Sequence, residues 1–384
     1  MSTGAPVRPS LATLPRELVD KILHLAAPRP LPHSTSHMLR ERNRTLLSVA
    51  QTCRALSGPA NALLWSCLHI VNTNGLDYLA SLPDEARRQL LFEQVRAVSM
   101  DDEDTNFKAP LLQLIPCLPH LARVVVQGGM SWFKLESFAA ISSLTTLQLG
   151  SVRVDRNSLH CTFPSLVSLS IAVLTFKFSG AATNFRSPFN AANFPALRAI
   201  YVWKCKHRND NVPTLLLFYP DLFAQLDTVE IPIDRISYMD RPPVNLPTSA
   251  HLVLRVTFRV NDGSLKLLHE RQKAYPGLPL PVLHFFIVCD NQATTEDCRR
   301  GLMALVCAVL EPQPPTLPAS LHLPLSLDLN RDLNARFSLD VLLQTCKSRG
   351  IEVCWYEAEE EPGHAVSTTV WRYVREHQAR SVEK

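Results

Sequence analysis

The sequence predicts an α/β fold: a small group of N-terminal helices, then a solenoid of short parallel strands joined by helices and loops. Two observations predict it. Apolar residues recur with helical spacing in the first seventy residues, and a spaced apolar motif then recurs along the rest of the chain. A length of 384 residues fits two or three domains, or one elongated array of repeated units.

The composition is that of a folded protein, and it excludes several classes of function. Hydrophobic residues make up 46% of the chain and charged residues 19%, which argues against wholesale disorder. Only 12 glycines are present, so there is little room for glycine-rich loops that hold phosphates or dinucleotides. The net charge of +4 is too small for an obvious nucleic-acid-binding protein, and it is concentrated in residues 1–71.

The first expected helix begins after Thr13, its predicted N-cap, and is stopped by Pro28 and Pro30. It has two apolar stripes. The first has the spacing i, i+4, i+8, i+11 and consists of Leu14, Leu18, Ile22 and Leu25. The second lies beside it and consists of Val19, Leu23 and Ala26. The helix can therefore contact apolar surfaces on two sides.

Two more helices are expected in this region, at residues 39–51 and 54–64, the second interrupted or offset at Gly58 and Pro59. Three such short helices carry more apolar side chains than a small bundle can hide. Large exposed apolar patches usually mark partner surfaces, so we expect this region to bind another protein.

Three segments of this helical region carry a recognisable motif. Residues 14–23 read Leu-Pro-Arg-Glu-Leu-Val-Asp-Lys-Ile-Leu, residues 46–56 read Leu-Leu-Ser-Val-Ala-Gln-Thr-Cys-Arg-Ala-Leu, and residues 63–65 read Leu-Leu-Trp. In this order they resemble the F-box, whose pattern is Leu-Pro-x-Glu-Leu-x-x-x-Ile, then Val-Cys-Arg-x-Trp, then Leu-Trp or Leu-Phe. The resemblance covers about residues 11–70. It departs from the family in a longer loop between the halves and in Leu56, where tryptophan is common.

The F-box resemblance implies a partner, because the three helices of that family bind the small adaptor subunit of SCF-type cullin–RING ubiquitin ligases. The implied adaptor contacts are Leu14, Pro15, Leu18 and Ile22 from the first helix and Leu46, Val49 and Cys53 from the second part. Two alternatives stay open. Leu18, Ile22 and Leu25 can instead be the core of the bundle, or the region can be a generic helical cap.

An apolar frame, Leu-x-x-Leu-x-Leu with apolar substitutes, recurs beyond this region. Its seven clear copies are Val95/Val98/Met100, Leu121/Val124/Val126, Leu144/Leu147/Leu149, Leu166/Leu169/Ile171, Leu197/Ile200/Val202, Leu226/Val229/Ile231 and Leu283/Phe286/Val288. The gap before the last copy has room for one irregular unit, with an alternating strand at residues 252–258. In four copies proline stands two residues before the first position and lets the strand begin cleanly, at Pro119, Pro164, Pro195 and Pro281.

In each copy, apolar positions two apart point to one face of a short strand, and that face is buried only against neighbouring units. The frame therefore resembles degenerate leucine-rich repeats, which stack into a parallel-strand solenoid. The asparagine or cysteine that normally follows the last leucine is missing from most copies. Many F-box proteins carry such arms, and long, irregular ones resemble those of mushroom-type fungi. The alternative is a set of ordinary strands in an α/β domain.

Helices are expected between the strands at residues 84–95, 133–140, 294–310 and 338–348. The last is predicted to start at the cap Ser338 and to end at Gly350. A strand at residues 351–356 follows, then an acidic linker and a helix at residues 366–383 that would cap the open end of the solenoid. The predicted domains are a flexible tail at 1–10, the F-box at 11–70, the solenoid at 71–356, and the linker with its C-terminal helix at 357–384.

The sequence contains no assembled catalytic motif. Gly-x-Gly-x-x-Gly, a phosphate loop, Gly-x-Ser-x-Gly and His-Glu-x-x-His are all missing, so we expect no enzyme activity and no cofactor. The acidic run at residues 101–104 lacks the spacing of a calcium loop and favours a solvated turn. The pairs Cys117/His120, His160/Cys161 and Cys205/His207 fall at different phases of their repeats, which argues against a shared zinc ion.

The best sequence candidate for a target-binding surface lies on and after the strand at residues 199–203. It consists of Tyr201, Trp203, Lys204, Lys206 and Arg208. Aromatic residues beside basic ones are common binding hot spots. The alternative is a solvated loop with one buried aromatic side chain.

Together these features predict a substrate receptor. The F-box would bind the adaptor and through it the cullin, and the repeat arm would hold a protein for ubiquitination by proximity, without a catalytic residue. The alternative is a leucine-rich-repeat scaffold outside any ligase, and the third possibility is an enzyme with an unrecognised site. No signal peptide is visible, and the longest apolar run, at residues 302–310, is shorter than the about 20 residues of a membrane span. We expect a cytoplasmic or nuclear protein without membrane or nucleic-acid partners.

Overall fold

The computed structural model describes residues 15–27, 36–52, 54–71, 79, 81, 84–102, 108–128, 132–154, 161–176, 189–207, 210–211, 220–232, 251–257, 282–288, 295–310, 318–328 and 333–356. These residues form an α/β structure of helices and parallel strands, which confirms the predicted class. The chain divides into two compact units, residues 1–127 and 128–384. Within the described ranges, no helix is long and apolar enough to cross a membrane.

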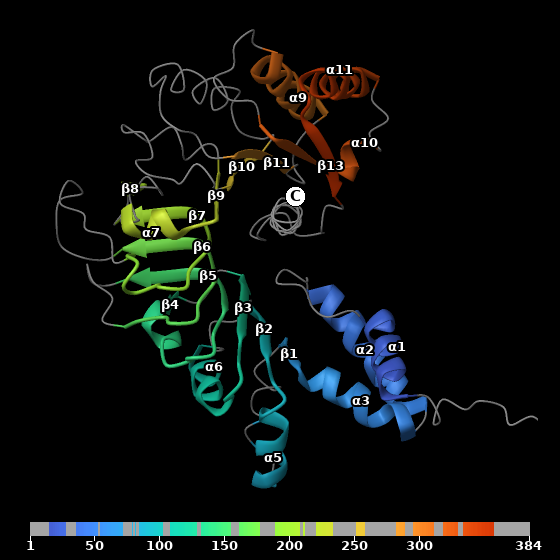
Figure 1. Cartoon of the computed structure of the whole chain (residues 1–384), viewed down its shortest axis with the longest axis vertical. Coiled ribbons are helices and arrows are strands. Elements are labelled where there is room, and N and C mark those ends of the chain that lie inside the picture. Colours follow the sequence, from blue (N-terminus) through green and yellow to red (C-terminus); the bar gives the residue numbers. More distant parts are fainter. Residues whose placement is uncertain are drawn as a thin grey trace, which may run out of the picture. The chain divides into compact units, whose positions relative to one another are not determined.

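Three helices begin the first unit: α1 (Arg16–Ala26), α2 (Ser36–Thr52) and α3 (Arg54–Trp65) (Figure 1). All three match predicted helices, although α3 continues through Pro59 instead of breaking there. Their shared core consists of Val19, Leu23, Ala27, Leu46, Leu56 and Ala60. Val19 and Leu23 of the predicted second stripe therefore hold the helices together, whereas Ala26 is exposed and Ala27, just after α1, takes its place in the core. The Arg42 guanidinium, which is also buried, donates a hydrogen bond to the Leu63 carbonyl and ties α2 to α3.

Replacing Leu23 with alanine should destabilise the first unit by about 2–5 kcal/mol, because it leaves a cavity in this core. Leu25, two positions on, has 80% of its surface exposed, so Leu25→Ala should change the stability by no more than about 0.5 kcal/mol. Urea unfolding followed by circular dichroism measures both. Equal effects of the two substitutions would contradict the assignment of the stripes.

The first unit also contains the strands β1 (Cys67–Ile70), β2 (Ala97–Asp102) and β3 (Arg123–Gly128), in that order in the sheet, with β1 and β2 parallel. Between them lie α5 (Glu85–Phe92), α6 (Lys108–Leu114) and a 3₁₀ turn (Ile115–Cys117). The carboxylate of Asp84 accepts a hydrogen bond from the Arg87 amide at 3.0 Å and caps α5. The predicted helix at 84–95 thus begins as expected and ends three residues early.

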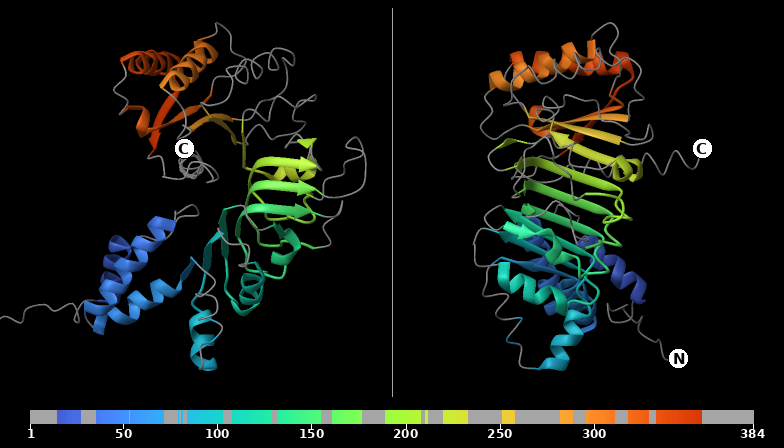
Figure 2. Two further views of the ribbon diagram at one scale, coloured as in Figure 1. Left: turned by 180° about the vertical axis from the view of Figure 1, so that it is seen from behind. Right: turned by 90° about the vertical axis from the view of Figure 1, so that its left-hand side faces the viewer.

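The second unit is built on parallel strands that pair in sequence order (Figure 2). They are β5 (Thr146–Val154), β6 (Ser168–Phe176), β7 (Ala199–His207), β9 (Thr228–Pro232), β10 (His251–Thr257), β11 (Val282–Val288), β12 (Ser320–Pro324) and β13 (Glu352–Tyr356). A short β4 (Trp132–Lys134) pairs with β5, and β8 (Asp210–Asn211) pairs antiparallel with β7. All strands expected from the apolar frame are present, whereas β4, β8 and β12, like β1 of the first unit, were not predicted.

A repeated turn precedes β5, β6 and β7, and before β6 and β7 it contains a proline. Before β6 the Leu166 amide hydrogen-bonds to the Phe163 carbonyl, and before β7 the Leu197 amide hydrogen-bonds to the Phe194 carbonyl. In each case the predicted proline lies between the two bonded residues. The rings of Phe163 and Phe194 stack with centroids 5.1 Å apart, so successive turns pack on each other as the strands do.

The helices of the second unit are α7 (Pro220–Gln225), α9 (Thr295–Leu310), α10 (Leu325–Asp328) and α11 (Leu333–Arg349). α9 and α11 pack together on one side of β11–β13 (Figure 1). α11 begins before Ser338, so that residue is buried inside the helix and is not its cap. Gly350, at a φ of 71°, ends α11, and the Ile351 amide bonds to the Cys346 carbonyl, as in the glycine-terminated helix end that was predicted.

The predicted helix at 133–140 is wrong. Its first residues are extended in β4, and only Leu135–Phe138 form a 3₁₀ turn. Phe133 and Leu135 are both fully buried. The backbone of residues 132–134 pairs with β5, which an α-helix starting at Phe133 would not allow.

The strands of the second unit bury one apolar face. Its members include Leu147, Leu149, Leu169, Ile171, Ile200, Val202, Val229, Leu254, Phe285, Ile287, Leu321 and Leu323. In β11 the predicted frame placed Phe286 and Val288 on this face, which is wrong by one residue. Phe285 is the residue that pairs with Leu254 on one side and with Leu321 on the other. Phe286 and Val288 therefore lie on the opposite face. The run Phe-Phe-Ile-Val is apolar at every position, so its period could not decide between the two frames.

Candidate functional site

An exposed apolar stripe runs along α1. Leu18, Ile22 and Leu25 have 46%, 42% and 80% of their surface exposed, although they lie at the i, i+4, i+7 spacing that puts side chains on one helix face. We call these three residues the α1 stripe. Because Val19 and Leu23 already supply the core, the structure excludes the alternative in which the α1 stripe forms it.

The other predicted adaptor contacts divide into three groups. Pro15 is exposed next to the α1 stripe. Leu46 is buried in the three-helix core, and Val49 packs against that core and is partly buried, so the structure does not bring either of them to an open apolar surface. Leu14 and Cys53 lie outside the described residues. Leu47, the neighbour of Leu46, is 46% exposed but was not among the predicted adaptor contacts.

Of the predicted target-binding residues, only Tyr201 has a described side chain, and it is buried where an exposed side chain was expected. Tyr201 has no exposed surface, so it does not lie on an open recognition face. Trp203, Lys204 and Lys206 belong to β7, but their side chains lie outside the described part of the structure, as does all of Arg208.

Tyr201 instead belongs to a row of buried polar side chains on the strand face opposite the apolar one. The pairing registers place these residues side by side across seven strands, with Val253 of β10 between the glutamate and the histidine. The row consists of Gln148, Ser170, Tyr201, Glu230, His284 and Ser320. We call the strand face that bears this row the polar face.

The strongest charge interaction on the polar face is an ion pair. Nε of Arg255 lies 3.2 Å from Oε1 of Glu230, and the two side chains are 4% and 0% exposed. The Arg255 guanidinium also lies over two rings, 5.1 Å from the centroid of Tyr201 and 5.5 Å from that of Phe286. Burial alone would lower the pKa of Arg255, but Tyr201, Glu230 and Tyr356 outweigh it and raise the pKa, so the group stays charged.

The aromatic contacts extend to the last strand. The rings of Phe286 and Tyr356 stack with centroids 4.6 Å apart, and the Tyr356 hydroxyl donates to the Ile287 carbonyl. Phe286 also forms a small apolar cluster with Val253 and Val288. The polar face thus holds a second core, built from alternating polar and aromatic side chains of β7, β9, β10, β11 and β13.

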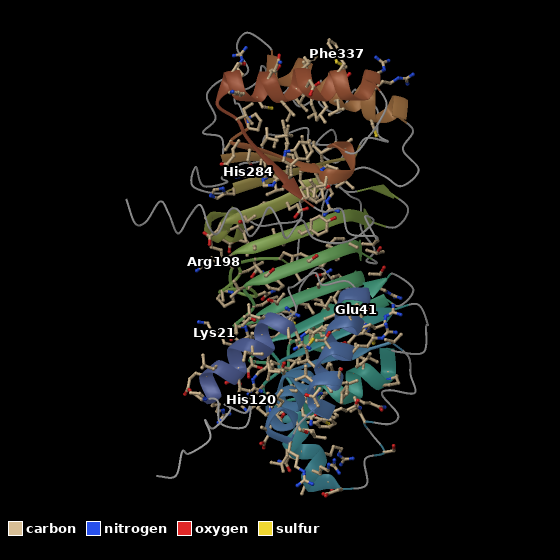
Figure 3. All side chains as sticks on the ribbon, turned by 90° about the vertical axis from the view of Figure 1, so that its right-hand side faces the viewer. Lys21, Glu41, His120, Arg198, His284 and Phe337 are labelled. Atoms are coloured by element: carbon tan, nitrogen blue, oxygen red, sulfur yellow. The ribbon has the colours of Figure 1, made fainter. Side chains whose placement is uncertain are left out.

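Two members of this row, His284 and Ser320, form a hydrogen-bonded chain with His251 and His322 across β10, β11 and β12. Nδ1 of His251 lies 2.8 Å from Nε2 of His284, whose Nδ1 lies 2.7 Å from the Ser320 hydroxyl. The same hydroxyl lies 2.8 Å from Nε2 of His322. Figure 3 shows His284 among the strands, while Phe337 points outward from α11. We call these four residues the histidine chain.

Burial lowers the pKa of His322 from its ordinary value of 6.5 to about 4, so this imidazole is neutral at neutral pH. The unfolded chain takes up a proton at His322 below about pH 6.5, whereas the folded chain does so only near pH 4. The unfolded state therefore binds more protons between these values. The contribution of His322 to stability is complete above pH 6.5 and is lost as the pH falls towards 4.

The geometry of Ser320 resembles a nucleophile beside a base, with His251 orienting His284. However, Ser320 and His322 have no exposed surface, so the hydroxyl is closed to a substrate in this structure. Within the described residues no three histidine, cysteine, aspartate or glutamate side chains are arranged to hold a metal ion. In the described part of the chain, the residues of the polar face are thus mostly buried, whereas the α1 stripe is an exposed apolar surface.

Models of known protein families do not match this chain, and neither the curated proteins nor the solved structures contain a match.

Proposed function

We propose that this chain is the substrate-recognition subunit of an SCF-type cullin–RING ubiquitin ligase, and that the α1 stripe is its contact with the adaptor. The observation that carries the proposal is the exposure of Leu18 and Ile22. Both lie within the F-box-like motif, and neither is needed for the core of the three helices. Exposed apolar side chains on one helix face fit an apolar groove on a partner.

The second unit is the arm that holds the target in this proposal. Parallel strands that follow one another in the sheet, several of them entered through a similar turn, support a solenoid of degenerate leucine-rich repeats. Tyr201 is buried and is therefore not part of the proposed target-binding surface. Trp203, Lys204, Lys206 and Arg208 stay as proposed target contacts.

The test is capture of the adaptor by the full chain. The double variant Leu18→Asp/Ile22→Asp should lose binding to a recombinant SCF adaptor by at least about 100-fold, because two carboxylates would be buried against an apolar groove. Leu90→Asp is the matched control, since Leu90 is 62% exposed on α5 and lies outside the motif. Titration calorimetry measures the affinities, and circular dichroism shows that each variant is folded.

Binding that is unchanged in the double variant would rule out the α1 stripe as the adaptor contact. If the unsubstituted chain does not bind the adaptor, the ligase assignment fails. The exposed stripe then supports the scaffold alternative, in which α1 binds a different protein.

A further inference from the structure

The histidine chain joins residues that are far apart in the sequence. His251 and His284 are 33 residues apart, and His284 and Ser320 are 36 residues apart. The side chains of His284, Ser320 and His322 are 2%, 0% and 0% exposed, and His251 is half-buried at one end. Any proton that enters the chain from water therefore arrives most easily at His251.

The number of hydrogens available for its hydrogen bonds limits how much positive charge the histidine chain can carry. Ser320 has one hydroxyl hydrogen, yet its oxygen lies within hydrogen-bond distance of a ring nitrogen on each side. When the serine donates to His322, it accepts from His284, which in turn accepts from His251. In this direction His251 can take a second proton without losing any link. A further proton on His322 removes the nitrogen that accepts the serine hydrogen. A second positive charge therefore breaks the hydrogen bonds of the histidine chain.

The charged groups described on the polar face affect how readily these imidazoles take up protons. Among the described residues, the buried carboxylate of Glu230 on β9 already pairs with Arg255 on β10. Other titratable groups described on this face include Tyr201 on β7 and Glu352, Cys354 and Tyr356 on β13. Of these, Glu352 is exposed, and burial together with Glu352 raises the pKa of Cys354 to about 11, so that thiol stays neutral. Arg255 itself repels a protonated imidazole.

We propose that the histidine chain is an acid-sensitive latch: it holds β10, β11 and β12 together while its imidazoles are neutral, and it releases them when more than one becomes protonated. The latch is local, because β5 and β6 carry the uncharged Gln148 and Ser170 on the same face and contain no histidine. It is independent of the proposed ligase function, since it concerns the stability of one part of the second unit.

Hydrogen exchange of the full chain, read peptide by peptide by mass spectrometry, tests the latch. At about pH 5, compared with about pH 7.5, peptides covering β10, β11 and β12 should exchange at least about tenfold faster after correction for the chemical rate. Peptides covering β5 and β6 should change less than about threefold. Equal acceleration in both sets would overturn the proposal, because it would mean general acid unfolding.

Two variants test the role of the imidazoles. His322→Gln places a neutral amide within reach of Ser320, and His251→Asn does the same at the half-buried end. Each variant should be folded at neutral pH. At about pH 5, the peptides of β10–β12 should then no longer show a much larger acceleration of hydrogen exchange than those of β5–β6. If both keep the acid response of the unsubstituted chain, the latch is refuted. If neither variant folds, the comparison of strand sets in the unsubstituted chain decides the question by itself.

Discussion

Arg255→Met is expected to destabilise the second unit by about 3–5 kcal/mol, because it leaves the carboxylate of Glu230 buried and without its cation. Glu230 has no exposed surface, so water cannot replace the lost partner. The guanidinium also covers the ring faces of Tyr201 and Phe286, and the flexible methionine side chain restores only part of that contact. Hydrogen exchange of the β9 and β10 peptides measures the loss within the second unit.

The double variant Glu230→Leu/Arg255→Met separates charge from packing. Replacing a buried ion pair by apolar residues of similar volume is often neutral, so the double variant should be within about 1 kcal/mol of the unsubstituted chain. Together with Glu230→Leu alone, the variants form a double-mutant cycle. A double variant as unstable as Arg255→Met would mean that the packing of the guanidinium between the rings, and not the charge, stabilises this face.

Phe286→Ala should have an effect of similar size, a loss of about 3–5 kcal/mol. The ring stacks on Tyr356, lies under Arg255 and packs against Val253, so its removal opens a cavity that three strands share. The matched control is Phe337→Ala on α11, where 69% of the surface is exposed and the expected change is within about 0.5 kcal/mol. Thermal unfolding followed by circular dichroism compares the two.

Similar melting temperatures for these two phenylalanine variants would show that the polar face is not a core. That result would also remove support for the ion-pair prediction, since Phe286 and Arg255 are in contact. Phe286→Leu is a useful intermediate, because it keeps most of the apolar volume and loses the ring stacking. Its stability should lie between those of Phe286→Ala and the unsubstituted chain.

The apolar frame predicted most strands because its signal is local. Apolar residues two apart and a preceding proline define a strand within a few residues, as for β6 and β7. The frame failed in β11, where four successive apolar residues leave two faces equally possible. It missed β12, a five-residue strand whose polar Ser320 and His322 make it look like a loop.

The buried polar face could not be predicted, because its partners come from different strands. Glu230 and Arg255 are 25 residues apart, and only the pairing register of β9 and β10 shows that they meet. The two stripes of α1 were visible in the sequence, but both are equally apolar. Which of them faces inward depends on α2 and α3, whose packing the sequence pattern does not specify.

The parallel registers also determine where this chain can change in length. Partners on the polar face are 25, 33 and 36 residues apart, so the links between strands already differ in size while the row stays unbroken. Lengthening a link costs only a slowly growing closure entropy. Inserting one residue within a strand, by contrast, turns every following side chain to the other face. Evolution can therefore vary the connections freely, whereas a single insertion inside β10 would bring Arg255 into the leucine-lined side of the sheet.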